Sequence, residues 1–241
     1  MHIPDGFIDA GTSAGAGVVA AAGVAVCLKK AADTMQEKQV AMAGLVSAFI
    51  FAVQMLNFPV ASGTSGHLLG GLLAAVLVGP WVGALCISVV LFVQALVFAD
   101  GGLSALGLNV VNMALVTALG GYVIFRTLRW LLPRTKGSVV VASGIAGFLS
   151  VVLASAAFTL EYAIGGAGGV SVSTVFGAMV GVHLLIGIGE GVITAATVGM
   201  VLAVRPDVVY GASDLEPELE IRAGLVTTSS ASAGVGAGGG R

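Results

Sequence analysis

The first two residues, Met1 and His2, form a compact set of nitrogen donors. The free α-amine of Met1, the backbone nitrogen of His2 and the His2 imidazole can close adjoining small rings around one transition-metal ion. A fourth nitrogen must come from elsewhere in the fold, and the chain has two other histidines, His67 and His183. A planar set of four nitrogens suits Ni(II), Cu(II) or low-spin Co(II), and it fits the oxygen-seeking Mg(II) and Ca(II) badly. Because most chains that begin with Met-His bind no metal there, the prediction depends on what the rest of the fold supplies.

His67 follows a run of small residues, Ala61-Ser62-Gly63-Thr64-Ser65-Gly66. Small, flexible residues allow a backbone to dip below a membrane surface, where irregular backbone is tolerated only when protein or a water-filled cavity surrounds it. Taken alone, His67 is equally well interpreted as a histidine at the membrane interface or as a metal ligand. Together with His2, it is interpreted as the ligand.

The composition predicts a protein of the cell membrane. Hydrophobic residues make up 57% of the chain and charged residues 9%, whereas soluble domains carry about 25% charged residues. The apolar runs are continuous and mostly approach the roughly 20 residues of a transmembrane helix, which excludes a β-barrel. We therefore expect an all-α, multi-pass bundle of about seven helices, with Pro80 leaving the third boundary open. The expected helices cover residues 8–32, 38–56, 67–78, 80–98, 107–132, 137–164 and 174–204.

The positions of Lys and Arg predict the orientation, because these residues collect in cytoplasmic loops. An N-terminus outside the cell and a cytoplasmic C-terminus place all ten basic residues on the inner side. These residues are Lys29, Lys30, Lys38, Arg126, Arg129, Arg134, Lys136, Arg205, Arg222 and Arg241. Met1, His2, the loop 57–67 and the turn 100–102 then share the outer face. Residues 1–9 lack the positive segment of a cleavable signal peptide and contain two aspartates, so we expect Met1 to persist.

Polar residues inside the membrane are further candidates, because their burial is costly. His183 and Glu190 are seven residues apart, so they lie on one face of a helix. The favoured interpretation is a structural role in interhelical hydrogen bonding, and the alternative is a role behind the metal ligands or in gating. Asn57 and Asp100 are preferred as groups that orient the imidazoles, since metal-bound histidines usually donate their other N–H to an outer acceptor. The same chemistry is available to Gln94, Asn109 and Asn112.

Four segments, in order along the chain, carry a resemblance to a known family. They are Met1-His2-Ile3-Pro4-Asp5-Gly6, the stretch 54–71, Asp100-Gly101-Gly102-Leu103 with Ala105-Leu106-Gly107, and His183-Leu184-Leu185-Ile186-Gly187 with Gly189-Glu190-Gly191. The pattern resembles the CbiM/NikM family, the substrate-capture membrane subunits of energy-coupling-factor importers for cobalt and nickel. The resemblance runs from residue 1 to about 206. It implies that the residues before the first helix insert into the core, and that the amine, backbone nitrogen and side chain of Met1 and His2 coordinate the metal with His67.

The resemblance also implies partners: a transmembrane coupling subunit and cytoplasmic ATPase subunits. A small accessory membrane subunit should be a separate chain, because no hydrophobic span follows residue 204. Ser62 departs from a family pattern that often has Gly there, a change that keeps the loop small. Residues 1–206 are thus expected to form a transmembrane metal-capture domain. Residues 207–241 are acidic and then rich in Ser, Thr, Gly, Ala and Val, which predicts a disordered cytoplasmic tail.

The absence of catalytic motifs from the sequence argues against an enzyme. There is no Walker phosphate loop and no His-Glu-x-x-His zinc motif, so ATP hydrolysis is assigned to partner chains. We expect a non-catalytic subunit that carries Co(II) or Ni(II) as its transported ion, needs no catalytic cofactor, and contacts membrane lipid but no nucleic acid. The alternatives are a stand-alone secondary metal permease, for which the inner half of the membrane offers few ionisable residues beyond Glu190, and a membrane enzyme. Nitrogen ligands alone do not separate cobalt from nickel.

Overall fold

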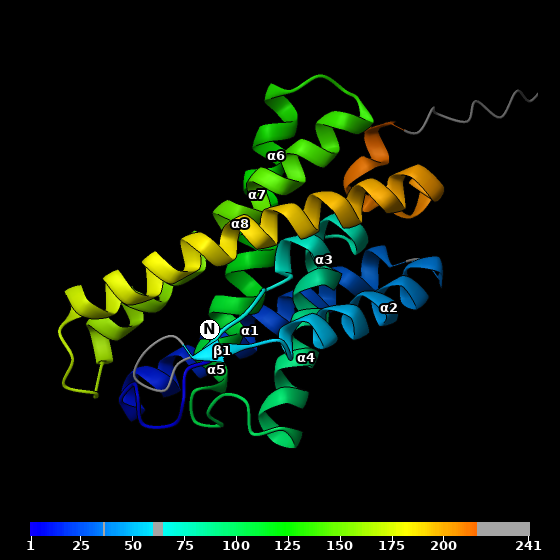
Figure 1. Ribbon diagram of the computed structural model, residues 1–241. Helices are drawn as coiled ribbons and strands as arrows, with labels where there is room; N and C mark the ends of the chain where they lie inside the picture. Colours follow the sequence, from blue (N-terminus) through cyan, green and yellow to red (C-terminus); the bar gives the residue numbers. More distant parts are fainter. Residues whose placement is uncertain (36, 60–64, 216–241) are drawn as a thin grey trace, which may run out of the picture.

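The computed structural model describes residues 1–35, 37–59 and 65–215 as a bundle of helices with one pair of two-residue strands (Figure 1). The elements are α1 (Ala10–Thr34), α2 (Glu37–Gln54), β1 (Phe58–Pro59), β2 (Ser65–Gly66), α3 (Gly71–Val78), α4 (Pro80–Val97), α5 (Leu106–Asn109), η1 (Val110–Gly120), α6 (Gly121–Leu131), α7 (Lys136–Gly165), α8 (Val172–Val204), η2 (Pro206–Val208) and η3 (Tyr210–Leu215). The elements α5, η1 and α6 form one continuous helical segment whose middle, η1, is π-helical. Within the described residues, five segments are long and apolar enough to cross a membrane: α1, α4, α5–η1–α6, α7 and α8. The predicted all-α membrane bundle of about seven helical segments is confirmed.

The third helix is shorter than the sequence suggested. It was expected to begin at residue 67, but α3 begins at Gly71 and contains eight residues, all of them buried. The backbone N–H groups of Leu69 and Gly70 donate to Glu190 of α8 rather than to helical carbonyls, and Gly70 has a left-handed φ of +75°, so the helix begins only at Gly71. Gly79, with a φ of +93°, separates α3 from α4, and Pro80 has no N–H to continue the helical ladder. A helix of eight residues is only about 12 Å long, so α3 lies within the protein and does not cross the bilayer.

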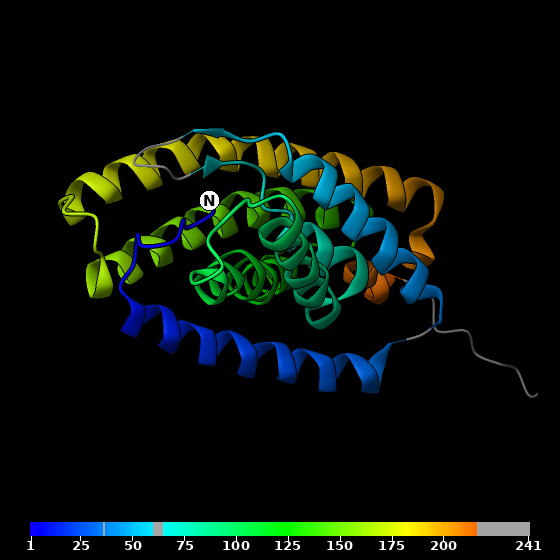
Figure 2. The same cartoon turned by 90° about the horizontal axis from the view of Figure 1, so that it is seen from below.

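The helices form an outer layer around a buried centre. Figure 2 shows α1 along one side of the bundle, α2 and α8 along the opposite side, and α3 and α4 between them. Large apolar side chains on α1 and α8 are exposed, for example Val18 and Ile188. An exposed apolar surface of this kind is what a helix presents to lipid.

The N-terminal segment is fixed at the end of the bundle where α7 turns into α8. Ile8 forms an isolated antiparallel bridge with Gly166, and the Asp9 N–H donates to the Gly165 carbonyl at 2.7 Å. The Asp9 carboxylate then accepts a hydrogen bond from the Thr12 N–H at 2.9 Å and caps α1. These contacts hold the start of α1 at the edge of the bundle. The residues before Ile8 extend from there toward the centre of the bundle.

The ordered chain continues past residue 206, contrary to the expectation of a disordered tail from residue 207. The elements η2 and η3 fold against the other end of the bundle, where Val209 and Ala212 are 2% exposed. Asp214 accepts a hydrogen bond at 2.7 Å from Arg129 of α6. The acidic composition of the tail led the sequence analysis to overlook the packing of Val209 and Ala212. The remaining tail, 216–241, lies outside the described residues.

Candidate metal centre

The first three residues are inserted into the bundle. Met1 and Ile3 are fully buried and His2 is 3% exposed. The Ile3 N–H donates to the Asn109 side-chain oxygen at 2.8 Å, and the Gly102 N–H donates to the Ile3 carbonyl at 2.8 Å. Asn109, on α5, was a lesser candidate in the sequence. Asn109 holds the N-terminal segment in place through its hydrogen bond with Ile3. The two residues are 106 positions apart, so the sequence alone did not predict this contact.

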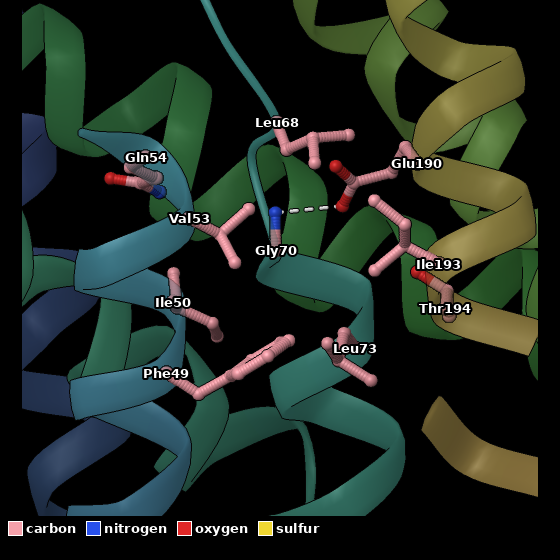
Figure 3. Close-up of a pocket in the computed structure, with 10 residues that line it drawn as sticks. All are labelled: Phe49, Ile50, Val53, Gln54, Leu68, Gly70, Leu73, Glu190, Ile193 and Thr194. Carbon is pink, nitrogen blue, oxygen red and sulfur yellow. Dashed lines mark hydrogen bonds between the residues drawn. The ribbon is translucent and has the colours of Figure 1, made fainter. Parts of the chain in front are cut away.

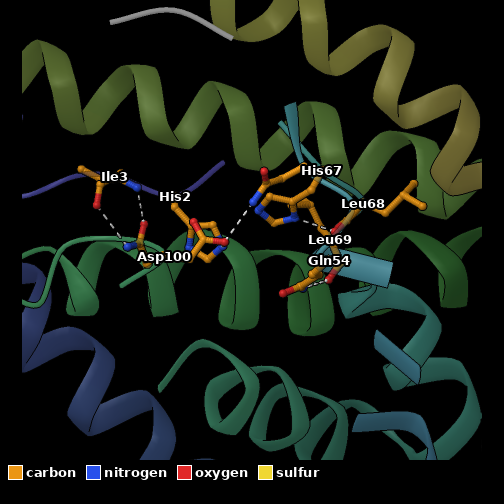
Figure 4. A network of polar contacts seen from close by, with 9 residues as sticks. His2, Ile3, Gln54, His67, Leu68, Leu69 and Asp100 are labelled. Atoms are coloured by element: carbon orange, nitrogen blue, oxygen red, sulfur yellow. Dashed lines mark hydrogen bonds and ion pairs between the residues drawn. The ribbon is translucent and has the colours of Figure 1, made fainter. Parts of the chain in front are cut away.

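The two predicted imidazole ligands lie next to each other. The ring centroids of His2 and His67 are 4.7 Å apart, with 31° between the ring planes. His67 is 1% exposed, and Figure 4 shows its ring beside that of His2, with the segment 67–69 leading away from the site. Two histidines that are 65 positions apart in the sequence, and the buried amine of Met1, are therefore gathered in one place.

A hydrogen bond indicates which nitrogen of the His67 ring carries a free lone pair. The Nδ1 of His67 lies 2.7 Å from the Leu68 carbonyl, which only accepts, so Nδ1 carries the proton and Nε2 is left as the donor to a metal. His67 Nε2 is buried and has no hydrogen-bond partner within the described chain. In His2, Nε2 lies 3.5 Å from an Asp100 carboxylate oxygen and makes no hydrogen bond among the described residues. A proton on Nε2 of His2 leaves Nδ1, the nitrogen nearer the backbone, available for a chelate with the Met1 amine.

Asp100 and Asn57, the two residues predicted to orient the imidazoles, lie beside His2 and contact each other. The Asn57 side-chain amide donates to the Asp100 carboxylate at 3.1 Å, and that carboxylate faces His2. A carboxylate behind a metal-binding imidazole fixes the ring orientation and makes the ring a better donor. Burial raises the pKa of Asp100 above its usual value, while the neighbouring amine lowers it. Asp100 is thus coupled to both N-terminal donors.

Burial also sets the protonation of the nitrogen donors. It lowers the pKa of the Met1 amine to about 4 and, together with that amine, lowers the pKa of His2 to about 3. Burial lowers the pKa of His67 well below its usual value. All three groups are neutral at neutral pH, so their lone pairs are available without the displacement of a proton. No group of three His, Cys, Asp or Glu side chains within the described residues is arranged to hold a metal.

Glu190 connects α8 to the segment that carries His67. Its two carboxylate oxygens accept hydrogen bonds from the Leu69 N–H at 2.8 Å and the Gly70 N–H at 2.7 Å. The buried Gln54 of α2 donates to the Leu69 carbonyl at 2.6 Å. Gln54 was not selected as a site residue from the sequence. Glu190 and Gln54 together satisfy backbone groups of residues 69–70, which lie outside the helices deep in the protein.

His183 does not make the expected interhelical hydrogen bond. Its Nδ1 lies 2.7 Å from the Met179 carbonyl, one turn back on the same helix. Its Nε2 is buried and has no hydrogen-bond partner among the residues that the structure describes. The sharing of a helix face by His183 and Glu190 therefore does not make them a pair, because each side chain has a different partner.

Below Glu190, the space between α2, α3 and α8 is narrow and apolar. Figure 3 shows the Glu190 carboxylate at one end of this pocket, with Phe49, Ile50 and Leu73 further along it. The pocket volume is about 10 Å³, which accommodates no more than about one water molecule. This pocket is therefore too small to serve as an open path below Glu190.

Gly101 offers a test of how closely the site is packed. Its φ is +90°, and a Cβ atom added there would lie 3.0 Å from His2 Nδ1 and 3.0 Å from the Asn109 amide nitrogen. We expect Gly101→Ala to displace His2 and to weaken Co(II) or Ni(II) binding about 10-fold, the lower end of effects seen for groups behind metal ligands. Gly169→Ala is the matched control, because Gly169 also has a positive φ of +67° but no heavy atom within 4 Å of the added Cβ. Equal affinities of the two variants in a calorimetric titration would contradict the packing argument.

The fold and the site together define a class: multi-pass helical membrane proteins with a buried, nitrogen-rich site at one end of the bundle. The chain belongs to the CbiM family. Residues 2–208 match the family described as the cobalt uptake substrate-specific transmembrane region. The predicted resemblance is thereby confirmed, and the chain is a membrane protein of the cobalt and nickel transport type.

Several relatives and one solved structure illustrate this membership. A fused NikMN protein of Archaeoglobus fulgidus, named for nickel transport, is 41% identical over 87% of this chain and 68% of its own length. The cobalt transport protein CbiM of Sorangium cellulosum is 34% identical over 86% of this chain and 94% of its own. The crystal structure of a truncated transition metal transporter superposes with a TM-score of 0.78 at 32% identity, covering 84% of this chain and 99% of the solved one. These relatives are named as transport proteins, which agrees with the expectation of a non-enzymatic chain.

Proposed function

We propose that this chain is the metal-capture subunit of an ATP-driven, energy-coupling-factor importer, and that it binds Co(II) or Ni(II) from the outer face of the membrane. The ligands are the Met1 amine, the His2 backbone nitrogen, His2 Nδ1 and His67 Nε2. The observation that carries the proposal is the burial of Met1 together with two imidazoles whose ring centroids are 4.7 Å apart. Family membership supports cobalt or nickel as the ion that is transported.

The proposed ligand set explains why the site selects a transition metal. Three adjoining donors from two residues favour a planar arrangement around the ion, and the His67 imidazole completes it. The His2 backbone nitrogen must lose its proton to bind, so metal capture should release a proton even though the amine and imidazoles are already neutral. The Asp100 carboxylate lies 3.5 Å from Nε2 of His2, where it favours the orientation that turns Nδ1 toward the metal. Ca(II) and Mg(II), which require oxygen ligands, gain little here.

Transport then depends on other chains. A transmembrane coupling subunit and cytoplasmic ATPases supply the conformational change that opens the site inward, because the pocket below Glu190 is narrow and apolar. Fused NikMN relatives join this type of chain to an additional portion. We propose that an accessory membrane portion of this type also acts together with the present chain.

Metal uptake with and without the partners tests this proposal. We expect radioactive Co(II) or Ni(II) to accumulate in cells that express the chain together with its coupling and ATPase subunits. Accumulation should fall to background when the ATPase carries an inactivating change in its phosphate loop. Full uptake with the inactive ATPase, or by the chain alone in vesicles with an ion gradient, would instead identify a stand-alone permease.

A further inference from the structure

A polar cavity lies at the end of the bundle away from the metal centre. Its volume is about 330 Å³, within the range of sites that hold small molecules or parts of larger ones. It is formed by α6, the turn between α6 and α7, and η3, which appears in orange in Figure 1, far from the N-terminus. The distribution of Lys and Arg predicts that this end faces the cytoplasm.

The charges around this cavity are unbalanced. Three guanidinium groups, those of Arg126, Arg129 and Arg134, line it together with the carboxylate of Asp214. That carboxylate is already paired with the buried Arg129, at 2.7 Å from its Nη2. Arg129 also donates to the Pro133 carbonyl at 3.1 Å, while its Nε is buried and has no hydrogen-bond partner among the described residues. The positive charges of Arg126 and Arg134 therefore have no balancing charge within the described lining of the cavity.

We propose that this cavity binds the phosphate group of an anionic membrane lipid. Planar guanidinium groups match the oxygens of a phosphate, and basic pockets at the cytoplasmic ends of transmembrane helices are suited to anionic headgroups. A buried arginine held in place by Asp214 and Pro133 gives the pocket a rigid charged wall, so the site is formed before the lipid arrives.

The surroundings favour a lipid over a soluble phosphate. Trp130, which lines the cavity, is 83% exposed, and its neighbours on α6 include Leu131 at 66% and Val123 at 65% exposure. Tryptophan is enriched where membrane meets water, with its ring at the level of the headgroups. A lipid whose phosphate enters the cavity can place its acyl chains against the apolar surface of α6. Inorganic phosphate gains nothing from that surface.

The purified full chain, titrated with short-chain lipids and observed by native mass spectrometry, tests this site. We expect one molecule of phosphatidylglycerol to be retained at concentrations where phosphatidylcholine is not. The double variant Arg126→Gln/Arg134→Gln should retain phosphatidylglycerol about 10- to 30-fold less strongly, because each basic residue near a membrane surface contributes about a factor of five. Both side chains are exposed and lie outside the Arg129–Asp214 pair, so the variant should fold.

Lys29→Gln/Lys30→Gln is the matched control. It removes the same charge from the same end of the bundle, near the end of α1, and should leave lipid retention unchanged. Equal retention of phosphatidylglycerol and phosphatidylcholine, or an equal loss in both double variants, would overturn the proposal. Displacement of the lipid by millimolar inorganic phosphate, with the phosphate itself bound, would show that the cavity holds a soluble anion and would overturn the proposal of a lipid site. Unchanged Ni(II) binding by both variants would show that they retain the fold, because the metal centre is at the other end.

Discussion

One residue added before Met1 should reduce Co(II) or Ni(II) binding by more than about 100-fold. The added residue converts the Met1 amine into an amide, which removes one of the four proposed nitrogen donors. It also needs space where none is left, because Met1 is fully buried and Ile3 is fixed on both sides by Asn109 and Gly102. Loss of a group that only supports a ligand costs 10- to 100-fold in affinity, so loss of a ligand should cost more. Calorimetry on the purified protein measures the difference directly.

The control for this experiment is the same protein after removal of the extra residue. A leader that a specific protease removes to expose Met1 lets one preparation be measured in both forms. We expect affinity to return on cleavage, with unchanged circular dichroism before and after. Equal affinity in both forms would exclude the Met1 amine as a ligand, and the site would then have to be built around His67 and His183.

The sequence was informative where a physical property is local. Continuous apolar runs identified the long helices, since a membrane-spanning helix needs about 20 such residues. The proposed donor set is also local in large part, because Met1 and His2 are adjacent in the sequence. The association of His67 with them was predicted from the shared side of the membrane, and the structure places the two rings in contact distance.

The hydrogen bonds that hold the site together could not be predicted from the sequence. The hydrogen bond from Ile3 to Asn109 and those from Leu69 and Gly70 to Glu190 join positions more than 100 residues apart. No periodicity encodes them, because each depends on where an irregular backbone lies relative to a helix. The start of α3 was misplaced for the same reason. An apolar run predicted a helix from residue 67, but the N–H groups of Leu69 and Gly70 donate to the Glu190 carboxylate instead of to helical carbonyls.

The end of the ordered chain illustrates a limit of composition. Residues 207–215 contain two aspartates and begin an acidic stretch, so the segment was assigned to a disordered tail. A short segment needs few buried side chains when it can pack against a surface that the rest of the protein has already formed. Val209 and Ala212 supply apolar contacts and Asp214 supplies a partner for Arg129. A segment of this kind is recognised only when the receiving surface is known.

Replacement of Glu190 by Gln should weaken metal binding by about 10- to 100-fold, although Glu190 contacts no proposed ligand. A glutamine offers one oxygen and one NH₂ group where the glutamate offers two acceptors to the N–H groups of Leu69 and Gly70. One buried N–H is then left facing another donor, at a cost of about 1–3 kcal/mol. The segment that carries His67 should shift to relieve this cost, and Nε2 of His67 should move out of the metal plane. Titration with Ni(II), followed by the visible absorption of planar nickel, reports both affinity and geometry.

Two further variants separate a positioning role from a general loss of stability. Glu161→Gln makes the same change in another partly buried glutamate, which accepts a hydrogen bond from Asn112 rather than from the His67 segment. It should retain both the affinity and the planar spectrum. His67→Ala removes the donor itself and sets the lower limit of binding in the same assay. If Glu190→Gln lowers the unfolding temperature but binds Ni(II) as tightly as the unmodified chain, with the same spectrum, then Glu190 stabilises the bundle without positioning His67. If its affinity falls between those of the other two variants, the Glu190 carboxylate positions His67 and links the metal site to α8. A movement of α8 driven by a partner subunit would then displace His67.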